Sequence, residues 1–141
     1  NVTIFKSNQQ TLNYFPLRLA RKFKNLTEIL IYGSSMMEIN PKDLRQFKFN
    51  LKVFVVQTGN IEVLQSALFA TMPNLEEVSF AYNEIMHVSD GVFTNLKHLN
   101  KLWFVYNRCH EGNSIDGNTT AVMQLSNEIE RKCKGKFVKN N

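Results

Sequence analysis

The chain has 141 residues, of which 43% are hydrophobic and 21% are charged, and its formal net charge at pH 7 is +5. This mixture predicts one packed globular domain, because the chain is too apolar to be disordered and too short for two full domains. No stretch approaches the roughly 20 consecutive apolar residues of a membrane-spanning helix, so we expect no membrane span and exclude a channel, a fibrous chain and a large enzyme.

The residues before Leu26 carry a weak version of a pattern that repeats clearly along the rest of the chain. The expected inward strand positions are Val2 and Ile4, and the apolar residues behind that strand are Leu12, Leu17 and Phe23. No cysteine-containing cap precedes Val2. We therefore expect the apolar strand edge around Val2, Ile4 and Phe5 to be covered by a preceding segment, covered by a second copy of the chain, or exposed to solvent. We favour a trimmed chain, which fits the start at Asn1 without Met, or a dimer.

Four later segments repeat one pattern. They read LTEILIYGSSM from Leu26, LKVFVVQTGNI from Leu51, LEEVSFAYNEI from Leu75 and LNKLWFVYNRC from Leu99, with starts 25, 24 and 24 residues apart. The alternation of apolar and polar residues over the first seven positions predicts a strand in each unit. Since one unit alone cannot bury its apolar side chains, the units must stack, and the stack buries them continuously.

The repeat aligns apolar residues into columns. Three inward columns belong to the strands: Leu26, Leu51, Leu75 and Leu99; Ile29, Phe54, Val78 and Leu102; Ile31, Val56, Phe80 and Phe104. Two further columns lie behind the strands: Leu44, Phe69 and Phe93; Phe23, Phe47, Met72 and Leu96. These residues are the predicted core.

These units resemble the leucine-rich-repeat family, in the variant with units of about 24 residues found in secreted and cell-surface proteins. The resemblance covers nearly the whole chain, and the unit from Leu75 to His98 matches the family pattern at every position. The front segment VTIFKSN and the cysteine-containing turn and helix at the rear are similar to small secreted leucine-rich-repeat proteins of insects. The resemblance implies an α/β solenoid, a short coil of about five units with a parallel concave sheet and a C-terminal capping helix.

In this family, one position of each unit is an asparagine whose side chain binds the backbone between coils. In this chain, different residues occupy that position. The expected positions are Ser7, Ser34, Gly59, Asn83 and Asn107, and only the last two are asparagine. Serine replaces the amide only partly and glycine not at all. We therefore expect looser coils in the front half.

A helical cap is predicted after the last repeat. Cys109 occupies the inward position of earlier units and is followed by a polar loop, residues 110–118. Thr120 is the expected N-cap of an amphipathic helix that carries Val122, Leu125, Ile129 and Cys133 on one face. A Cys109–Cys133 disulfide would pin this helix across the last coil, and two buried free thiols are the alternative.

These features divide the chain into repeats (1–108), a C-terminal cap (109–135) and a basic tail (136–141). Three Asn-x-Ser/Thr triplets, at Asn1, Asn25 and Asn118, are candidate glycosylation sites. Together with the paired cysteines they favour an extracellular, secreted chain.

No pattern in the sequence predicts catalysis. Cys109, His110 and Glu111 invite a nucleophile-base interpretation, but adjacent residues on a turn point in different directions and a disulfide would consume the thiol. The histidines lack metal-ligand spacing, and the scattered glycines form no phosphate-binding loop. We expect no enzyme activity, no metal and no cofactor.

Basic residues form two clusters near the ends of the chain. The first comprises Arg18, Arg21, Lys22 and Lys24, and the second comprises Arg131, Lys132, Lys134, Lys136 and Lys139. They form no continuous stripe, so we predict no specific nucleic-acid binding and interpret them as solvated flanks and a tail. Anionic glycans or lipid headgroups are weaker alternatives.

The outward side chains of the strand row are the predicted partner-binding surface. The expected central row is Thr3, Leu30, Val55, Ser79 and Trp103, and the partner-binding residues are Phe5, Leu30, Tyr32, Val53, Val55, Tyr82, Trp103, Val105 and Tyr106. Apolar and aromatic side chains on an outward face indicate an interaction site. The sequence thus predicts a secreted, non-enzymatic recognition module that binds a protein or peptide through the concave face. The resemblance suggests a role in adhesion, signalling or innate immunity.

A structural or assembly protein is the alternative. It would self-associate, as a homodimer for example, through the concave face or through the N-terminal edge around Phe5.

Overall fold

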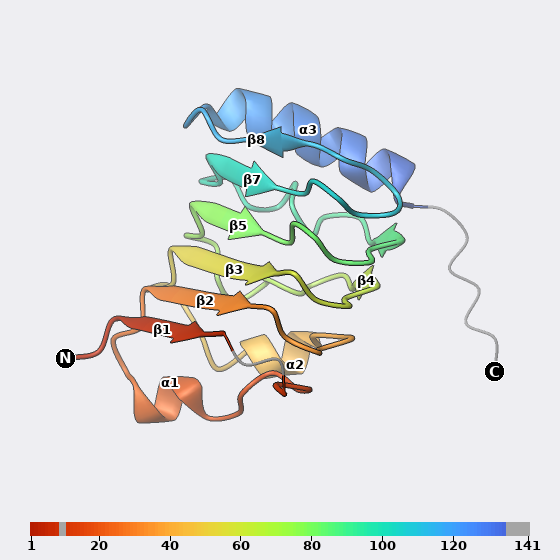
Figure 1. Cartoon of the computed structure of the whole chain (residues 1–141). Helices are drawn as coiled ribbons and strands as arrows, with labels where there is room; N and C mark the ends of the chain where they lie inside the picture. The colour runs from red at the N-terminus through yellow and green to blue at the C-terminus, as the bar shows by residue number, and fades with distance from the viewer. Residues whose placement is uncertain (9–10, 135–141) are drawn as a thin grey trace.

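The computed structural model describes residues 1–8 and 11–134 and shows a solenoid closed at one end by a helix (Figure 1). The predicted basic tail, 136–141, lies outside the described residues. The strands are β1 (Ile4–Ser7), β2 (Glu28–Tyr32), β3 (Val53–Gln57), β4 (Val63–Leu64), β5 (Glu77–Ser79), β6 (His87–Val88), β7 (Lys101–Trp103) and β8 (Asn113–Ser114). The helices are α1 (Leu19–Lys22), α2 (Pro41–Leu44) and α3 (Thr119–Lys132).

The main sheet confirms the predicted solenoid. Its order is β1-β2-β3-β5-β7-β8, and neighbours are parallel except for β8, which runs antiparallel to β7. The parallel strands come from successive units, so the chain makes about four full turns between them. A second sheet pairs β4 with β6 on the flank of the coil. The fold is therefore an α/β leucine-rich-repeat-type solenoid with a parallel sheet and a C-terminal helix.

The predicted core columns stack in register. Ile29, Phe54, Val78 and Leu102 are consecutive partners across four strands, and all four are fully buried. The four unit-opening leucines are buried as well. Phenylalanine rings continue the stack behind the sheet, with Phe54 and Phe69 5.4 Å apart between centroids and Phe93 and Phe104 6.0 Å apart. Each turn thus buries its apolar side chains against its neighbours, as a repeat fold requires.

The register of the first strand differs from the prediction. Phe5 pairs with Ile29 and packs against the core, whereas Ile4 pairs with Glu28 and is 47% exposed. Assigning Ile4 inward and Phe5 to the concave face was therefore wrong. A one-residue slip reverses every side chain of a strand, and the observed register buries the larger aromatic ring. Ser7 likewise pairs with Ile31, so the residue equivalent to Ser34 falls outside the described residues.

Two buried asparagines tie the rear coils together as predicted. The Asn83 side-chain amide donates to the carbonyls of Val56 (2.8 Å) and Phe80 (2.9 Å), and its oxygen accepts from the backbone N–H of Ile61 (3.2 Å). Asn107 binds Phe80 and Phe104 carbonyls and the Ile85 N–H in the same way. Each amide satisfies backbone groups of two successive turns that would otherwise be buried without partners.

The front coils use a different solution at the equivalent positions. Ser34 is buried, and among the described residues its hydroxyl accepts one N–H, that of Met36, at 3.4 Å. Gly59 has no side chain, and a Cβ there would lie 2.9 Å from Asn83 Oδ1. The glycine therefore leaves the space into which the amide of the next turn reaches. The Gly59 N–H still donates to the Tyr82 carbonyl, at 3.0 Å.

The cap helix α3 begins two residues earlier than predicted. Its N-cap is Asn118, whose side-chain oxygen accepts the N–H groups of Thr120 (2.9 Å) and Ala121 (3.3 Å). Asn118 therefore takes the role expected of Thr120. It lies two and three positions before the N–H groups that need an acceptor, and the amide oxygen of asparagine is a favoured N-cap acceptor. The predicted disulfide is present, and it joins Cys109 to the buried Cys133 at the end of the helix.

A buried carboxylate adds a second attachment of the cap. Glu130 accepts hydrogen bonds from the backbone N–H groups of Gly91 (2.5 Å), Phe93 (3.2 Å) and Thr94 (2.8 Å) and from the Thr94 hydroxyl (3.0 Å). The Val88 N–H also donates to the Cys133 carbonyl, at 3.1 Å. The helix is therefore held by a covalent bond, a charged acceptor and a backbone hydrogen bond.

Candidate functional site

The concave face consists of outward side chains in three rows set by the strand register. The central row is Lys6, Leu30, Val55, Ser79, Trp103 and Asn113, so Lys6 replaces the expected Thr3. A second row contains Ile4, Glu28, Val53, Glu77 and Lys101. The third contains Tyr32 and Gln57 and continues along the sequence to Ala81 and Val105. The face is thus mostly uncharged in its middle and charged along one side.

The centre of this face is closed rather than open. Val55 is only 3% exposed, and Ser79 and Ala81 are also buried. The Gln57 amide crosses from β3 to donate to the Ser79 hydroxyl at 2.6 Å. Small residues on β5 allow the neighbouring side chains to close over Val55, so the expectation that Val55 offers contact area was wrong. Leu30, Tyr32, Val53, Trp103 and Val105 remain half-buried.

Two tyrosines at the end of the concave strands form its most exposed aromatic feature. The rings of Tyr82 and Tyr106 stack with centroids 4.8 Å apart and an interplanar angle of 18°, and the residues are 50% and 58% exposed. Sequence analysis named both residues but not their stacking. The recurrence of the pair Tyr-Asn 24 residues apart was the signal for it, since equivalent positions of adjacent turns lie side by side.

The backbone holds these tyrosines in an uncommon conformation. Gly33, Thr58, Tyr82 and Tyr106 occupy the same position in four units, and their φ angles are 66°, 57°, 60° and 59°. Glycine adopts this left-handed region freely, whereas a bulky side chain rarely does. The adjacent asparagine bridges keep the turn in place, and the rings project from a rigid position.

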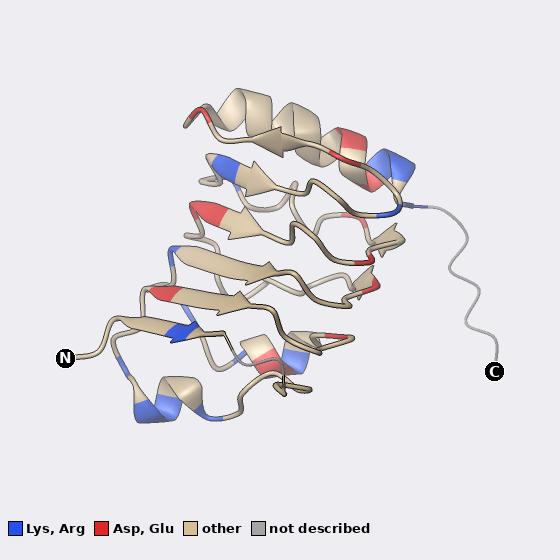
Figure 2. Ribbon diagram, in the orientation of Figure 1, with Lys and Arg blue, Asp and Glu red and all other residues tan. Residues whose placement is uncertain are grey.

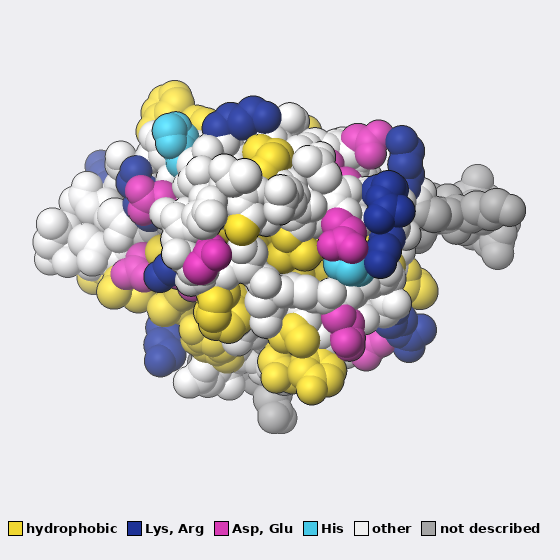
Figure 3. Space-filling view, turned by 90° about the horizontal axis from the view of Figure 1, so that it is seen from above, with side chains coloured by type: hydrophobic (Ala, Val, Ile, Leu, Met, Phe, Trp, Pro, Cys, Tyr) yellow, Lys and Arg dark blue, Asp and Glu magenta, His cyan; other side chains and the backbone are white. Residues whose placement is uncertain are grey.

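Apolar surface surrounds the tyrosine pair. Trp103 and Val105 lie on and beside β7, next in the stack to β5. Hydrophobic side chains are prominent along the lower edge of Figure 3, the side on which the sheet lies. At the other end of the face, Lys6 Nζ lies 5.7 Å from the Tyr32 ring centroid, a cation–π distance. The aromatic residues of this face therefore differ in character, with a cation at one end and bare rings at the other.

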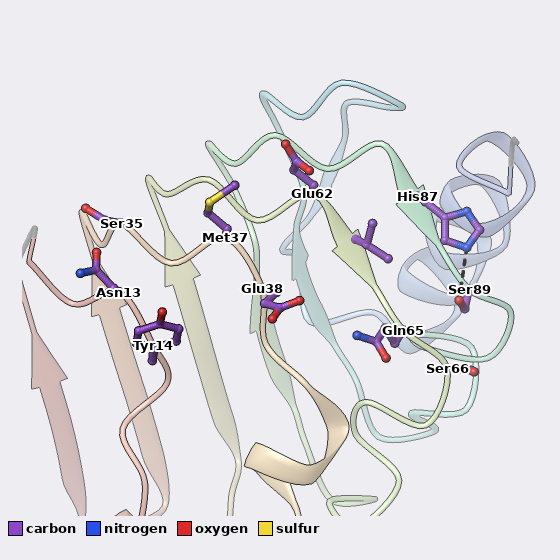
Figure 4. A pocket seen from close by; sticks show the side chains of 11 residues that line it. Asn13, Tyr14, Ser35, Met37, Glu38, Glu62, Gln65, Ser66, His87 and Ser89 are labelled. Carbon is purple, nitrogen blue, oxygen red and sulfur yellow. Dashed lines mark hydrogen bonds between the residues drawn. The ribbon is translucent and has the colours of Figure 1, made fainter. Parts of the chain in front are cut away.

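A trough on the flank of the coil was missed by sequence analysis. It has a volume of about 900 Å³ and is lined by Asn13, Tyr14, Ser35, Met37, Glu38, Glu62, Val63, Gln65, Ser66, His87 and Ser89 (Figure 4). His87 Nε2 and the Ser89 hydroxyl are 3.3 Å apart there. The trough draws on four segments far apart in the sequence, which is why no local motif indicated it.

The residues considered for catalysis are engaged in structural contacts. Cys109 is disulfide-bonded, so it offers no thiolate, and His110 Nε2 lies 3.6 Å from Glu128 Oε2 on the cap helix. Among residues 1–8 and 11–134, no group of three or more His, Cys, Asp or Glu residues is arranged to hold a metal ion.

Two of the candidate glycosylation sites meet at one edge of the sheet. The Asn25 side-chain amide donates to Asn1 Oδ1 at 2.7 Å, and both residues are exposed. Asn118 is exposed at the start of the cap helix and uses its side-chain oxygen for capping. Within the described ranges, no helix combines the length and apolarity needed to cross a membrane.

Comparisons with known proteins agree with this architecture. The leucine-rich-repeat family matches residues 49–108. Among solved structures, a chain in the Toll–Spätzle complex, described as a molecular hub in Drosophila development and innate immunity, has a TM-score of 0.69 and 19% sequence identity. That match covers 77% of this chain and 14% of the other, so this chain spans a small part of its length. No curated protein matches the sequence. The family match over residues 49–108 and the solenoid agree on a leucine-rich-repeat architecture.

Proposed function

We propose that this chain is a non-enzymatic recognition module that binds a protein or peptide through the concave face. The observation that supports this most directly is the exposed Tyr82–Tyr106 stack beside Trp103 and Val105. Aromatic side chains contribute most of the binding energy at many protein interfaces, because they bury much area and lose little conformational freedom. A rigid pair also reduces the ordering cost of association.

The family and the neighbouring structure support a recognition role by analogy. Leucine-rich-repeat folds present an extended face of stacked strands to a partner. The matched chain belongs to a complex of Toll with Spätzle, which is described as a hub of development and innate immunity. On this analogy we propose a role in adhesion, signalling or innate immunity.

We also propose that the chain works outside the cell and is glycosylated at Asn1, Asn25 and Asn118. The Cys109–Cys133 disulfide supports this compartment, because such bonds persist where conditions are oxidising. Expression in a secretory host followed by removal of N-linked glycans should increase electrophoretic mobility. Single Asn→Gln variants assign each shift, and an unchanged mobility in all of them would contradict the proposal.

The binding proposal is tested by capture with matched variants. The immobilised chain is incubated with extracellular fluid of its source organism, and bound proteins are identified for the native chain, for Trp103→Ala with Tyr106→Ala, and for Met37→Ala. Met37 is an exposed apolar residue in the flank trough and controls for general stickiness. We expect loss of the captured protein only with the double variant, at an unchanged melting temperature. Equal capture by all three chains would rule out the concave face as the binding site.

Self-association is the second candidate function. Val2 and Ile4 are both 47% exposed beside β1, which within the described residues pairs only with β2. An apolar strand edge can pair with a second copy. Light scattering over a concentration series tests this: a dimer dispersed by Ile4→Lys supports edge pairing, and a dimer dispersed by Tyr106→Asp supports pairing through the concave face. A monomer at all concentrations contradicts both.

A further inference from the structure

We propose that the first two turns carry a binding site for sulfated polysaccharide, separate from the concave face. The site, here called the basic patch, consists of Arg18, Arg21, Lys22, Lys24, Lys42, Arg45 and Lys48, all of which are exposed. Four belong to segment 18–24 around α1 and three to segment 42–48 around α2. Figure 2 shows basic segments gathered around α1 at the base of the solenoid.

Tertiary contacts bring the two segments together. Gln46 reaches from the second turn to the first, where its side-chain oxygen accepts the Ala20 N–H at 3.0 Å and its nitrogen donates to the Pro16 carbonyl at 3.5 Å. The Phe15 and Phe47 rings meet edge to face beneath them, 6.1 Å apart. The cations of both segments therefore share one surface, although more than twenty residues separate most of them in sequence.

A groove runs between the two turns. It has a volume of about 260 Å³; its floor is apolar, formed by Ala20, Phe23, Leu26, Phe47 and Leu51, and its polar lining residues are Lys24, Gln46, Lys48 and Asn50. An extended polymer can lie in such a groove with cations on both sides. Lysine and arginine supply point charges and paired donors, which suit the oxygens of sulfate groups.

The charge of the patch is not neutralised by the protein. Segments 18–24 and 42–48 hold seven basic residues and one acidic residue, a net charge of +6 against +5 for the whole chain. The acidic residue, Asp43, is occupied in capping α2, where its carboxylate accepts the Asn40 N–H at 3.0 Å. None of the seven cations forms an ion pair within the part of the chain that the structure describes.

Several basic residues elsewhere on the coil are paired. Lys52 pairs with Glu76, Arg108 with Glu84, Lys132 with Glu128 and Lys134 with Asp90, whereas Lys6, Lys97, Lys101 and Arg131 form no ion pair among the described residues. Seven of the eleven unpaired Lys and Arg residues that the structure describes therefore lie on the first two turns. A dense surface of uncompensated cations attracts a polyanion and releases counterions on binding.

Among polyanions, the fold favours a sulfated polysaccharide over a membrane. Only Arg21, Lys22 and Lys42 of the patch lie in helices, and these two helices have four residues each, too short to present an amphipathic face to a bilayer. The disulfide supports an oxidising, extracellular setting, where clusters of Lys and Arg serve as heparin-type sites.

The test uses heparin as the probe and variants matched in charge. We compare heparin affinity at several NaCl concentrations for the native chain, for Arg21→Ser with Lys24→Ser and Lys48→Ser, and for Lys97→Ser with Lys132→Ser and Lys134→Ser. The patch variant should bind about tenfold or more weakly at 0.15 M salt, and the slope of log K against log [NaCl] should fall by about 2. The control variant should change little, although it loses the same charge.

Each contrary outcome overturns the proposal. Equal losses in the two triple variants would mean that net charge alone attracts heparin. Patch-dependent binding of phosphatidylserine vesicles or of oligo(dT) with affinity equal to that of heparin would refute specificity for sulfated polysaccharide. The variant Trp103→Ala with Tyr106→Ala should retain heparin binding, so a failure of the concave-face proposal stays distinguishable from a failure of this one.

Discussion

The front and rear halves of the solenoid share one repeat but close their turns differently. In the rear, Asn83 and Asn107 each bind backbone groups of successive turns, and the cap is held by the disulfide and by Glu130. In the front, Ser34 and Gly59 occupy the equivalent positions and supply fewer side-chain hydrogen bonds. The apolar columns and the backbone pairing of the strands therefore align the front turns without asparagine bridges. We expect the polar positions to set how much each junction adds to stability.

The disulfide should have the largest effect of any single contact in the rear half. Replacing Cys109→Ala and Cys133→Ala together, or reducing the native bond, should lower the free energy of unfolding by about 3–4 kcal/mol, because the unfolded chain regains loop entropy. Urea unfolding with and without reductant measures this. The double variant should be insensitive to reductant, and an equal response of variant and native chain would contradict the assignment.

Replacing the residue at the asparagine position in one turn of each half compares the stability that this position contributes in the two halves. Asn83→Ala should cost about 2–4 kcal/mol, since it removes the side-chain hydrogen bonds to the Val56 carbonyl and the Ile61 N–H and leaves the Phe80 carbonyl with Asn107 as its side-chain donor. Ser34→Ala, which removes one long hydrogen bond, should cost about 1 kcal/mol or less. Chemical denaturation of both variants gives the difference. Equal costs would mean that the two halves are held with similar strength.

Adding a side chain at Gly59 should disturb the hydrogen bonds of Asn83 in the next turn. Gly59→Ala places a Cβ 2.9 Å from Asn83 Oδ1, and we expect a loss of about 1–2 kcal/mol through overpacking. In the background of Asn83→Ala the same change should cost much less, because the colliding atom is gone. A double-mutant cycle measures this coupling, and additive losses would show that the contact is unimportant.

The smallest effect is expected from a polar group inside the cap. The Ser126 hydroxyl is buried and has no hydrogen-bond partner among the described residues. Ser126→Ala should therefore raise the free energy of unfolding by about 0.5–1 kcal/mol, because it removes an unsatisfied group from the core. Thermal unfolding compares it with the exposed Asn127→Ala, and a clear loss of stability at Ser126 would reveal an unrecognised contact.

Repeat periodicity predicted the parts of the structure that depend on many equivalent residues. The buried columns were predicted because the same spacing recurs in several turns, the parallel sheet and the two asparagine bridges followed from the family resemblance, and the disulfide followed from the placement of Cys109 and Cys133. Predictions that depended on one residue were less secure. The β1 register was wrong by one position, and Asn118 rather than Thr120 caps α3.

The candidate site was only partly predictable. The outward positions of Trp103, Tyr82 and Tyr106 follow from strand alternation, but the burial of Val55 depends on how side chains of neighbouring turns close over it. The flank trough was invisible in the sequence, and only the part of the basic patch in residues 18–24 was recognised, because each feature combines segments from different turns.

The amino-acid sequence by itself determined that this chain coils, which side chains face inward, and where the repeat ends in a disulfide-bonded helix. Periodic apolar residues suffice for this, since every turn can be buried only by another of its kind. The tertiary structure decided what lies on the surface: which aromatic rings stack, which outward residues are covered, and which cations meet without an acidic partner. Those outcomes depend on distances between side chains of adjacent turns, and such distances exist only once the turns have packed together.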